Sequence, residues 1–336
     1  MRLGRLAVAW ILGARALCGQ SVEETELILQ HLQTAAESTD YRAVQVRRVR
    51  GHFSGLGRGG EWVGAIESVM HRGAAAGREE QFSLELRGFE GVALSVPELA
   101  QRQVLYQSRA AYLFRYQSFR VLDARAAAQQ YVVVALGEGA VRAGRYCNRI
   151  AVVSRTPDRP SWLLDLDAAL GVPLYAGEFT PNGALVAELE VGQISFGSAA
   201  HLPDGTNWGW TPRMGVEEFA SAAQARARAR TIVSIDIAPA DLGGRYVFDH
   251  ARVVTDPLTG EQSLVHVFHD GIDAIFVSQR AREPLHTKTH TIRLYDEAGV
   301  HQCLFQQGGT EFLLVGRNTK LKDIATRLYR RAAASL

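Results

Sequence analysis

The chain has 336 residues; 47% are hydrophobic, 21% are charged, and the formal net charge is +2. This length accommodates two domains, and the composition is ordinary for a globular protein that buries a core. A net charge so close to zero argues against a nucleic-acid-binding protein, which needs a concentrated basic face.

The first residues have the layout of a secretory signal peptide. A basic start precedes an apolar run, Leu6 to Leu12, that is too short to span a bilayer, and small residues follow. We expect cleavage after Cys18 or Gly19, so that residues 1–19 are removed and the mature chain is periplasmic. Those residues hold three arginines and no acid, so cleavage changes the formal charge from +2 to −1. Retention as a short anchor and lipidation of Cys18 are the alternatives.

Two cysteines remain after this cleavage, Cys147 and Cys303. An oxidising compartment allows them at most one intramolecular disulfide. They are far apart in the sequence and fall in different predicted domains, so we expect two buried free thiols rather than a bridge.

An amphipathic helix is predicted directly after the signal peptide. Ser21 has the character of an N-cap, and Glu24 stands three residues later, as in a capping box. The apolar residues near helical spacing, which we expect to face the core, are Leu27, Ile28, Leu32 and Ala35.

Short strands follow this helix, interrupted by a polar helix from Val96 to Gln107. Two of the predicted strands carry apolar side chains on one face only, because side chains alternate along a strand. Further strands are separated by turn residues, among them Asn182–Gly183, which favours a tight hairpin and an antiparallel meander. The one-sided apolar residues are Phe82, Leu84 and Leu86 on the first strand and Tyr112, Phe114 and Tyr116 on the segment 111–122.

A segment rich in Gly, Pro and small polar residues, 199–214, predicts a linker. It separates an N-terminal domain, 20–198, from a smaller α+β domain, 215–336, so that the whole chain is α+β with mostly antiparallel strands. The second domain closes with a predicted helix whose apolar stripe is Leu321, Ile324, Ala325 and Leu328.

One segment of the second domain is locally basic, with Arg226, Arg228 and Arg230 in "QARARAR". Such a run is usually a solvated helix face. A contact for an anionic lipid or an acidic partner is the alternative.

Three motifs resemble chemical sites but lack the required context. The glycines of "GLGRGG" (Gly55–Gly60) fit a dinucleotide fingerprint, yet a strand rather than a helix is predicted to follow them. His286 and His290 share a strand face, but no third metal ligand is near. Asp165 and Asp167 flank a turn that Gly171 completes. The sequence therefore predicts no catalytic residue, no metal and no cofactor.

The stretch "VHVFHDGIDAIFV" (Val265–Val277) combines histidines with aspartates. Asp270–Gly271 predicts a two-residue hairpin turn, which pairs His266 with Ile275. His266 and His269 then point to opposite faces and cannot converge on one ion. We expect a buried central hairpin rather than a metal site.

A series of turn and strand residues resembles the end of the N-terminal domain of the MucB/RseB family, periplasmic regulators of the envelope-stress sigma factor σE. Residues 268–272 resemble the family's C-terminal strand pair around Asp–Gly, and residues 312–328 resemble its closing strand and helix. The residues of the first series are Ala143–Arg145, Pro157, Leu164–Asp165, Gly171, Glu178, Asn182–Gly183 and Glu188.

The resemblance implies a non-enzymatic sensor of lipid or lipopolysaccharide. Its N-terminal domain would be a curved half-barrel with a helix, like the carriers LolA and LolB, with the one-sided apolar residues holding acyl chains. Its C-terminal domain would bind the periplasmic part of an anti-sigma factor, and bound lipid would shift the equilibrium toward release of that partner. The alternative is a periplasmic lipid or lipoprotein carrier without a signalling partner.

Overall fold

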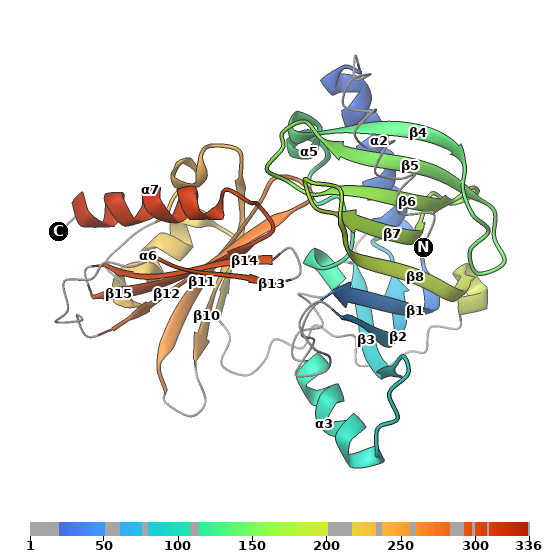
Figure 1. Cartoon of the computed structure of the whole chain (residues 1–336), viewed down its shortest axis with the longest axis horizontal. Helices are drawn as coiled ribbons and strands as arrows, with labels where there is room; N and C mark the ends of the chain where they lie inside the picture. The colour runs from blue at the N-terminus through green and yellow to red at the C-terminus, as the bar shows by residue number, and fades with distance from the viewer. Residues whose placement is uncertain are drawn as a thin grey trace. The chain divides into compact units, whose positions relative to one another are not determined.

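The structure is a computed structural model that divides into two compact units, unit 1 (Met1–Thr211) and unit 2 (Pro212–Leu336). Each unit contains one antiparallel sheet with helices, which confirms the predicted fold class (Figure 1). The predicted signal peptide and most of the predicted linker lie outside the described residues. The residues that the structure describes are 20–50, 61–75, 80–107, 114–200, 217–232, 237–255, 260–282, 292–297, 300–307 and 309–334.

Unit 1 is built on an eight-stranded sheet with the strand order β3-β2-β1-β8-β7-β6-β5-β4. All neighbouring strands are antiparallel. Its elements are α2 (Val22–Ser38), β1 (Tyr41–Arg50), β2 (Trp62–Arg72), β3 (Gln81–Phe89), α3 (Val96–Gln107), α5 (Ala124–Gln130), β4 (Tyr131–Glu138), β5 (Cys147–Ser154), β6 (Ser161–Asp167), β7 (Pro173–Phe179), β8 (Leu185–Phe196) and the 3₁₀ helix η1 (Gly197–Ala200).

Helix α2 begins with the predicted capping box. The Ser21 hydroxyl accepts from the Glu24 amide, and the Glu24 carboxylate accepts from the Ser21 amide. The predicted buried face was right for Leu32, which is 6% exposed, and wrong for Leu27 and Ile28, which are 58% and 36% exposed; Thr25 and Leu29 are buried instead. Thr25 tolerates burial because its hydroxyl donates to the Ser21 carbonyl, so the buried row includes a polar residue that an apolar pattern omits.

The predicted strand at 111–122 was also wrong. Residues 114–116 are helical, and the described residues after them reach the Asp123 N-cap of α5 without forming a strand. Strands β3 and β4 lie at opposite edges of the sheet, so the chain between them must cross from edge to edge. A segment that crosses the sheet cannot also pair within it.

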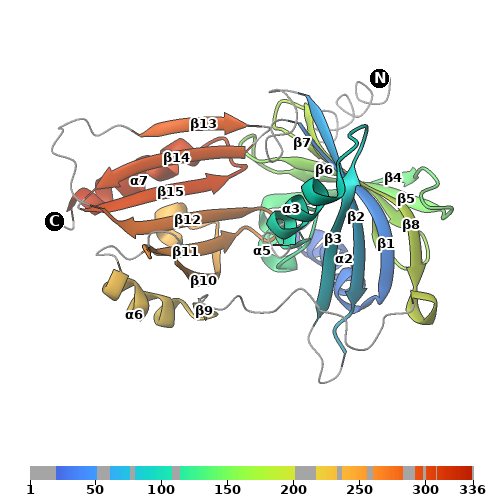
Figure 2. The ribbon, with the colours of Figure 1, turned by 90° about the horizontal axis from the view of Figure 1, so that it is seen from below.

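Unit 2 is built on a seven-stranded antiparallel sheet with the strand order β13-β14-β15-β12-β11-β10-β9. Figure 2 shows the strands of this sheet side by side. Its elements are β9 (Glu217–Phe219), α6 (Ala222–Ile232), the 3₁₀ helix η2 (Pro239–Leu242), β10 (Val247–Thr255), β11 (Gln262–His269), β12 (Ala274–Ala281), β13 (Arg293–Glu297), β14 (Val300–Gln307), β15 (Thr310–Gly316) and α7 (Leu321–Ala334).

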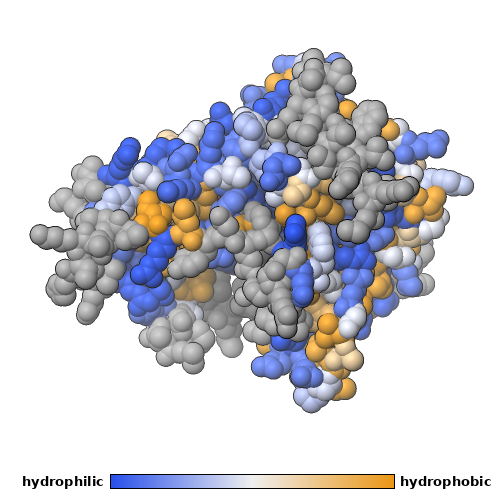
Figure 3. Space-filling model, in the orientation of Figure 1, coloured by the Kyte–Doolittle hydropathy of each residue, from blue (hydrophilic) through white to orange (hydrophobic). Residues whose placement is uncertain are grey.

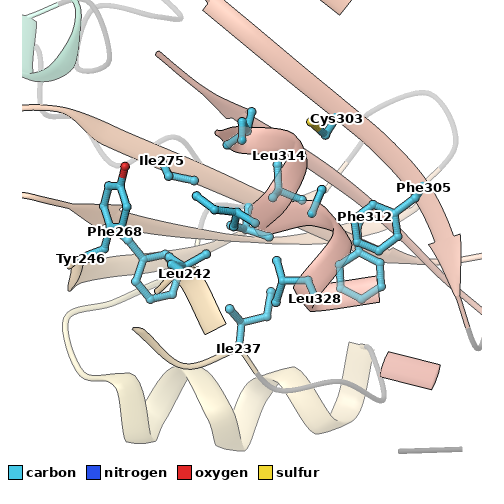
Figure 4. Close-up of a cluster of buried hydrophobic side chains, with 14 of the residues drawn as sticks. Ile237, Leu242, Tyr246, Phe268, Ile275, Cys303, Phe305, Phe312, Leu314 and Leu328 are labelled. Carbon is cyan, nitrogen blue, oxygen red and sulfur yellow. The ribbon is translucent and has the colours of Figure 1, made fainter. Parts of the chain in front are cut away.

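Helix α7 buries the apolar stripe predicted from the sequence. Leu321, Ile324, Ala325 and Leu328 are each at most 2% exposed. They join a cluster that the strands supply with Phe268, Ile275, Cys303, Phe305, Phe312 and Leu314 (Figure 4). This helix is therefore part of the unit 2 core.

The hairpin β11–β12 exists, but its predicted turn was wrong. His266 pairs with Val277 rather than Ile275, because the strands are joined by four residues, 270–273. The Asp270 carboxylate accepts from the amides of Ile272 (3.1 Å) and Asp273 (2.8 Å), which stabilises the longer loop. His266 and His269 are three apart on one continuous strand and lie on opposite faces, as predicted.

Both remaining cysteines, Cys147 and Cys303, are buried, and they form no disulfide with one another. This agrees with the expectation of two separate thiols. Among the helices in the described parts of the chain, none is long and apolar enough to cross a membrane.

Candidate functional site

The candidate apolar strip on β3 lies on a buried face of the unit 1 sheet. Phe82, Leu84 and Leu86 are 2%, 3% and 1% exposed. On the neighbouring strand β2, the register places His71 beside Phe82 and Glu67 beside Leu86. The strip is thus apolar along β3, and a polar residue of β2 lies beside each of its ends.

A connection between β3 and α5 covers this strip, and we call α3 together with residues 114–118 the cover. Helix α3 packs on β3 (Figure 2) and donates a hydrogen bond from Gln103 Nε2 to the Leu86 carbonyl at 3.0 Å. The Phe114 ring stacks on Phe82 with centroids 4.1 Å apart. The strip is therefore closed in this structure.

The cover is itself weakly buried. Among the described side chains of α3, Tyr106 alone is buried, at 4% exposure. Val96 and Val104 are 83% and 67% exposed, and Figure 3 shows apolar side chains on the outside of this helix, at the bottom of the view. A helix with so few buried contacts belongs to the low-stability end of a fold.

Of the second candidate set, the structure brings Phe114 to the strip, though from a helical turn rather than a strand. Tyr116 is buried in the same turn, at 7% exposure. Tyr112 lies outside the described residues.

A buried ion pair lies beneath the cover. Arg47 donates from Nε to Glu67 Oε1 at 2.7 Å and from Nη2 to Oε2 at 3.2 Å. Their side chains are 3% and 0% exposed. Gln45 Nε2 donates to Glu67 Oε2 at 2.6 Å, the Tyr106 hydroxyl donates to Oε1, and Arg47 Nη1 donates to the Ser118 hydroxyl at 2.7 Å. A buried pair is tolerated only when such additional hydrogen bonds satisfy it.

A second polar cluster stands at the other end of the strip. His71 Nδ1 lies 2.7 Å from the Thr39 carbonyl and Nε2 lies 2.7 Å from Glu80 Oε1, and the Phe114 ring stacks on the imidazole. Burial alone would raise the pKa of Glu80, but hydrogen bonds from His71 and Arg120 outweigh it and lower the pKa to about 2. This carboxylate therefore joins Arg120, which follows the cover in the chain, to His71 on the sheet in its ionised form.

The acidic residues around the β6–β7 turn have structural roles. Asp165 is fully buried and pairs with Arg149 at 2.7 Å and Arg142 at 3.0 Å. Asp167 accepts from the amides of Ala169 and Leu170, which stabilises the turn that the sequence predicts.

The basic run lies on α6, as far as the structure describes it. Arg228 donates from Nε to the Glu217 carboxylate at 2.8 Å, so one of the three arginines is already paired within unit 2. The side chains of Arg226 and Arg230 lie outside the described residues. Their role as partner-binding residues stays a prediction.

His266 is buried in the unit 2 sheet at 1% exposure. Gln279 Nε2 lies 3.4 Å from its Nδ1, and burial lowers the pKa of the imidazole to about 4. This is the signature of a neutral packing residue. His286, His290 and "GLGRGG" lie outside the described residues, and within the described part no three His, Cys, Asp or Glu side chains gather to hold a metal ion.

The residues that sequence reasoning missed are Gln45, Arg47, Glu67, Tyr106 and Ser118. The alternation of side chains along β1 could have found the first two. Gln45 and Arg47 are in phase with Ala43, which is 2% exposed, and so occupy inward positions of the strand. Polar residues at inward positions are unusual enough to mark a buried network.

Comparison with solved structures places both units in a known architecture. One structure of MucB in complex with MucA(peri) matches over 90% of this chain and 97% of its own, with a TM-score of 0.55 and 16% identity. A MucA/MucB complex from Pseudomonas aeruginosa matches over the same shares, with a TM-score of 0.52 and 17% identity. The chain has a MucB-like fold. No protein-family model matches it, and a search of curated proteins found no relative.

Proposed function

We propose that the chain is a non-enzymatic periplasmic regulator that binds the periplasmic part of an anti-sigma factor and responds to lipid. The observation that supports this most is the extent of the fold match. It spans 90% of the chain and therefore includes unit 2, and the matched MucB structures contain MucA. A simple carrier of the LolA type would need only unit 1.

The partner test uses the purified periplasmic part of a single-span anti-sigma factor from the same cell. We expect a stable complex whose association slows when Arg226, Arg228 and Arg230 are replaced by Gln. The slowing should shrink at high salt, because exposed charges steer encounter more than they hold a complex. Arg330→Gln on the exposed side of α7 is the matched control. Absence of any complex would leave the lipid-carrier alternative ahead.

The lipid part of the proposal rests on the closed apolar strip of β3. An acyl chain can reach Phe82, Leu84 and Leu86 only if the cover moves, and the weak burial of α3 means that few apolar contacts of this helix are lost when it does. Each buried CH₂ of the chain gains about 0.8 kcal/mol. Ligand binding would thereby favour an open state, which is the differential affinity that a sensor requires.

Titration with a fluorescent fatty acid tests this idea. We expect saturable binding that weakens in Leu84→Ala, because that change removes apolar area from the strip. Tyr106→Phe should bind more tightly, since it removes the hydroxyl that holds the cover to Glu67. Val104→Thr, on the exposed side of α3, is the control. If neither Leu84→Ala nor Tyr106→Phe changes the affinity, the ligand binds elsewhere.

A further inference from the structure

The ion pair beneath the cover allows the ligand class to be narrowed, on the assumption that acyl chains enter as proposed above. Two of the pair's hydrogen bonds come from the cover itself. The Tyr106 hydroxyl donates to Glu67 Oε1, and the Ser118 hydroxyl accepts from Arg47 Nη1. The remaining bonds join Arg47, Glu67 and Gln45 on the sheet, so they persist when the cover moves.

Displacement of the cover therefore removes one hydrogen-bond partner from Glu67 and one from Arg47. Glu67 Oε1 keeps the bond from Arg47 Nε but loses the Tyr106 donor, and Arg47 Nη1 loses the Ser118 acceptor. The loss of a hydrogen bond by a buried charged group is costly, so a ligand that fills the strip without restoring both bonds binds at a penalty. A plain alkyl chain restores neither bond.

Charge cannot supply the missing bonds either. Arg47 and Glu67 already neutralise one another through two hydrogen bonds, so the pair presents no net charge to a ligand. An anionic headgroup close to Arg47 would also approach Glu67, and a cationic headgroup would approach Arg47. A ligand that restores both hydrogen bonds must therefore carry a neutral donor and a neutral acceptor close together.

We infer that the unit 1 site selects acyl chains that carry a hydroxyl group close to a carbonyl oxygen. The hydroxyl of such a chain donates to Glu67 in place of Tyr106, and the carbonyl oxygen accepts from Arg47 in place of Ser118. The hydrocarbon tail lies along Phe82, Leu84 and Leu86. A β-hydroxyacyl ester has this arrangement of groups.

The test compares two neutral ligands that differ by one hydroxyl, methyl β-hydroxylaurate and methyl laurate. Each displaces dansylaminoundecanoic acid from the purified full chain. We expect the hydroxylated ester to bind about tenfold more tightly, which is the effect of one well-made hydrogen bond to a charged group. In Tyr106→Phe both esters should bind more tightly by the same factor, so their ratio is retained.

The double variant Arg47→Met with Glu67→Leu is the decisive control. It replaces the pair with apolar side chains of similar volume, a change that proteins usually tolerate. The preference should fall to about one while methyl laurate still binds. Equal affinities in the unchanged protein, or a preference that survives the double variant, would overturn this inference alone. Failure of both esters to bind would instead remove the proposed lipid binding.

Discussion

Helices α3 and α7 each lie on one face of an antiparallel sheet, yet they are fastened in different ways. Helix α7 buries five side chains, Leu321, Ile324, Ala325, Leu328 and Ala332, in an apolar core (Figure 4). Among the described side chains of α3, Tyr106 alone is buried, and its hydroxyl bonds to an ion pair. Apolar burial stabilises α7 on its sheet, whereas the one buried side chain of α3 bonds to the ion pair of Arg47 and Glu67; we therefore expect α3 to detach more readily than α7.

The largest effect on stability is expected from breaking the buried ion pair of Arg47 and Glu67. Arg47→Met should destabilise unit 1 by about 3–5 kcal/mol, because it leaves the Glu67 carboxylate buried without its cation. The double variant with Glu67→Leu should recover most of this loss. Urea unfolding followed by tryptophan fluorescence reports unit 1, since every tryptophan precedes Pro212. A harmless single substitution would mean that the pair is solvated.

The next effect compares the two helices directly. Leu328→Ala in α7 should cost about 3 kcal/mol, as for other fully buried leucines. Leu99→Ala in α3 should cost less than about 1 kcal/mol, because that side chain is only partly buried against the strip. Hydrogen–deuterium exchange measures both helices in one experiment. Equal protection of α3 and α7 in the unchanged protein would contradict the idea of an exchangeable cover.

Acid should weaken the two units in different pH ranges. Burial lowers the pKa of His266 from 6.5 to about 4, so the folded form of unit 2 prefers the neutral ring. Above pH 6.5 the buried ring is neutral in both the folded and the unfolded state and costs unit 2 no stability. As the pH falls from 6.5 to 4, the free energy of unfolding of unit 2 decreases by up to about 3 kcal/mol. The pKa of Glu80 in unit 1 is lowered from 4.5 to about 2, so its contribution is lost only between those values.

Unfolding measured at several pH values, with tryptophan fluorescence for unit 1 and hydrogen exchange for unit 2, separates these ranges. His266→Leu should remove the loss in unit 2 between pH 6.5 and 4. A loss in that range that persists in His266→Leu would assign the effect to another group.

The smallest effect is expected on the outside of α3. Val104→Thr should change the unfolding free energy by no more than about 0.5 kcal/mol, because Val104 is 67% exposed. Its rate of hydrogen exchange should likewise match that of the unchanged protein. A large loss would show that something covers this side of the helix.

Sequence patterns predicted correctly the elements that depend only on neighbouring residues. The capping box of Ser21 and Glu24 and the stripe of α7 follow from neighbouring residues, and both are present. The hairpin turn failed because the Asp270 side chain stabilised a longer loop than its dipeptide suggests. The segment 111–122 failed because its path depends on where β3 and β4 lie in the sheet.

The candidate site shows the same division. Alternation along a strand identified Phe82, Leu84 and Leu86 as one face, and they do share a buried face. The pair of Arg47 and Glu67 was missed because charged residues are expected to face water, although alternation places Arg47 in phase with the buried Ala43. The contact of Glu67 with Tyr106 joins residues far apart in the sequence, and no local pattern contains it.

The pairing of β1 with β8 also sets the order in which unit 1 can assemble. The first strand finds its partners on one side in β2, but on the other side only in β8, where Tyr41 meets Phe196. Contacts between such distant parts of a chain slow folding, because a long loop must close before they form. During synthesis or export the β1 edge remains unpaired until β8 emerges, and an unpaired edge is open to association with other chains. Unit 1 should therefore depend on folding assistance more than unit 2, whose hairpin β11–β12 joins strands that are adjacent in the sequence.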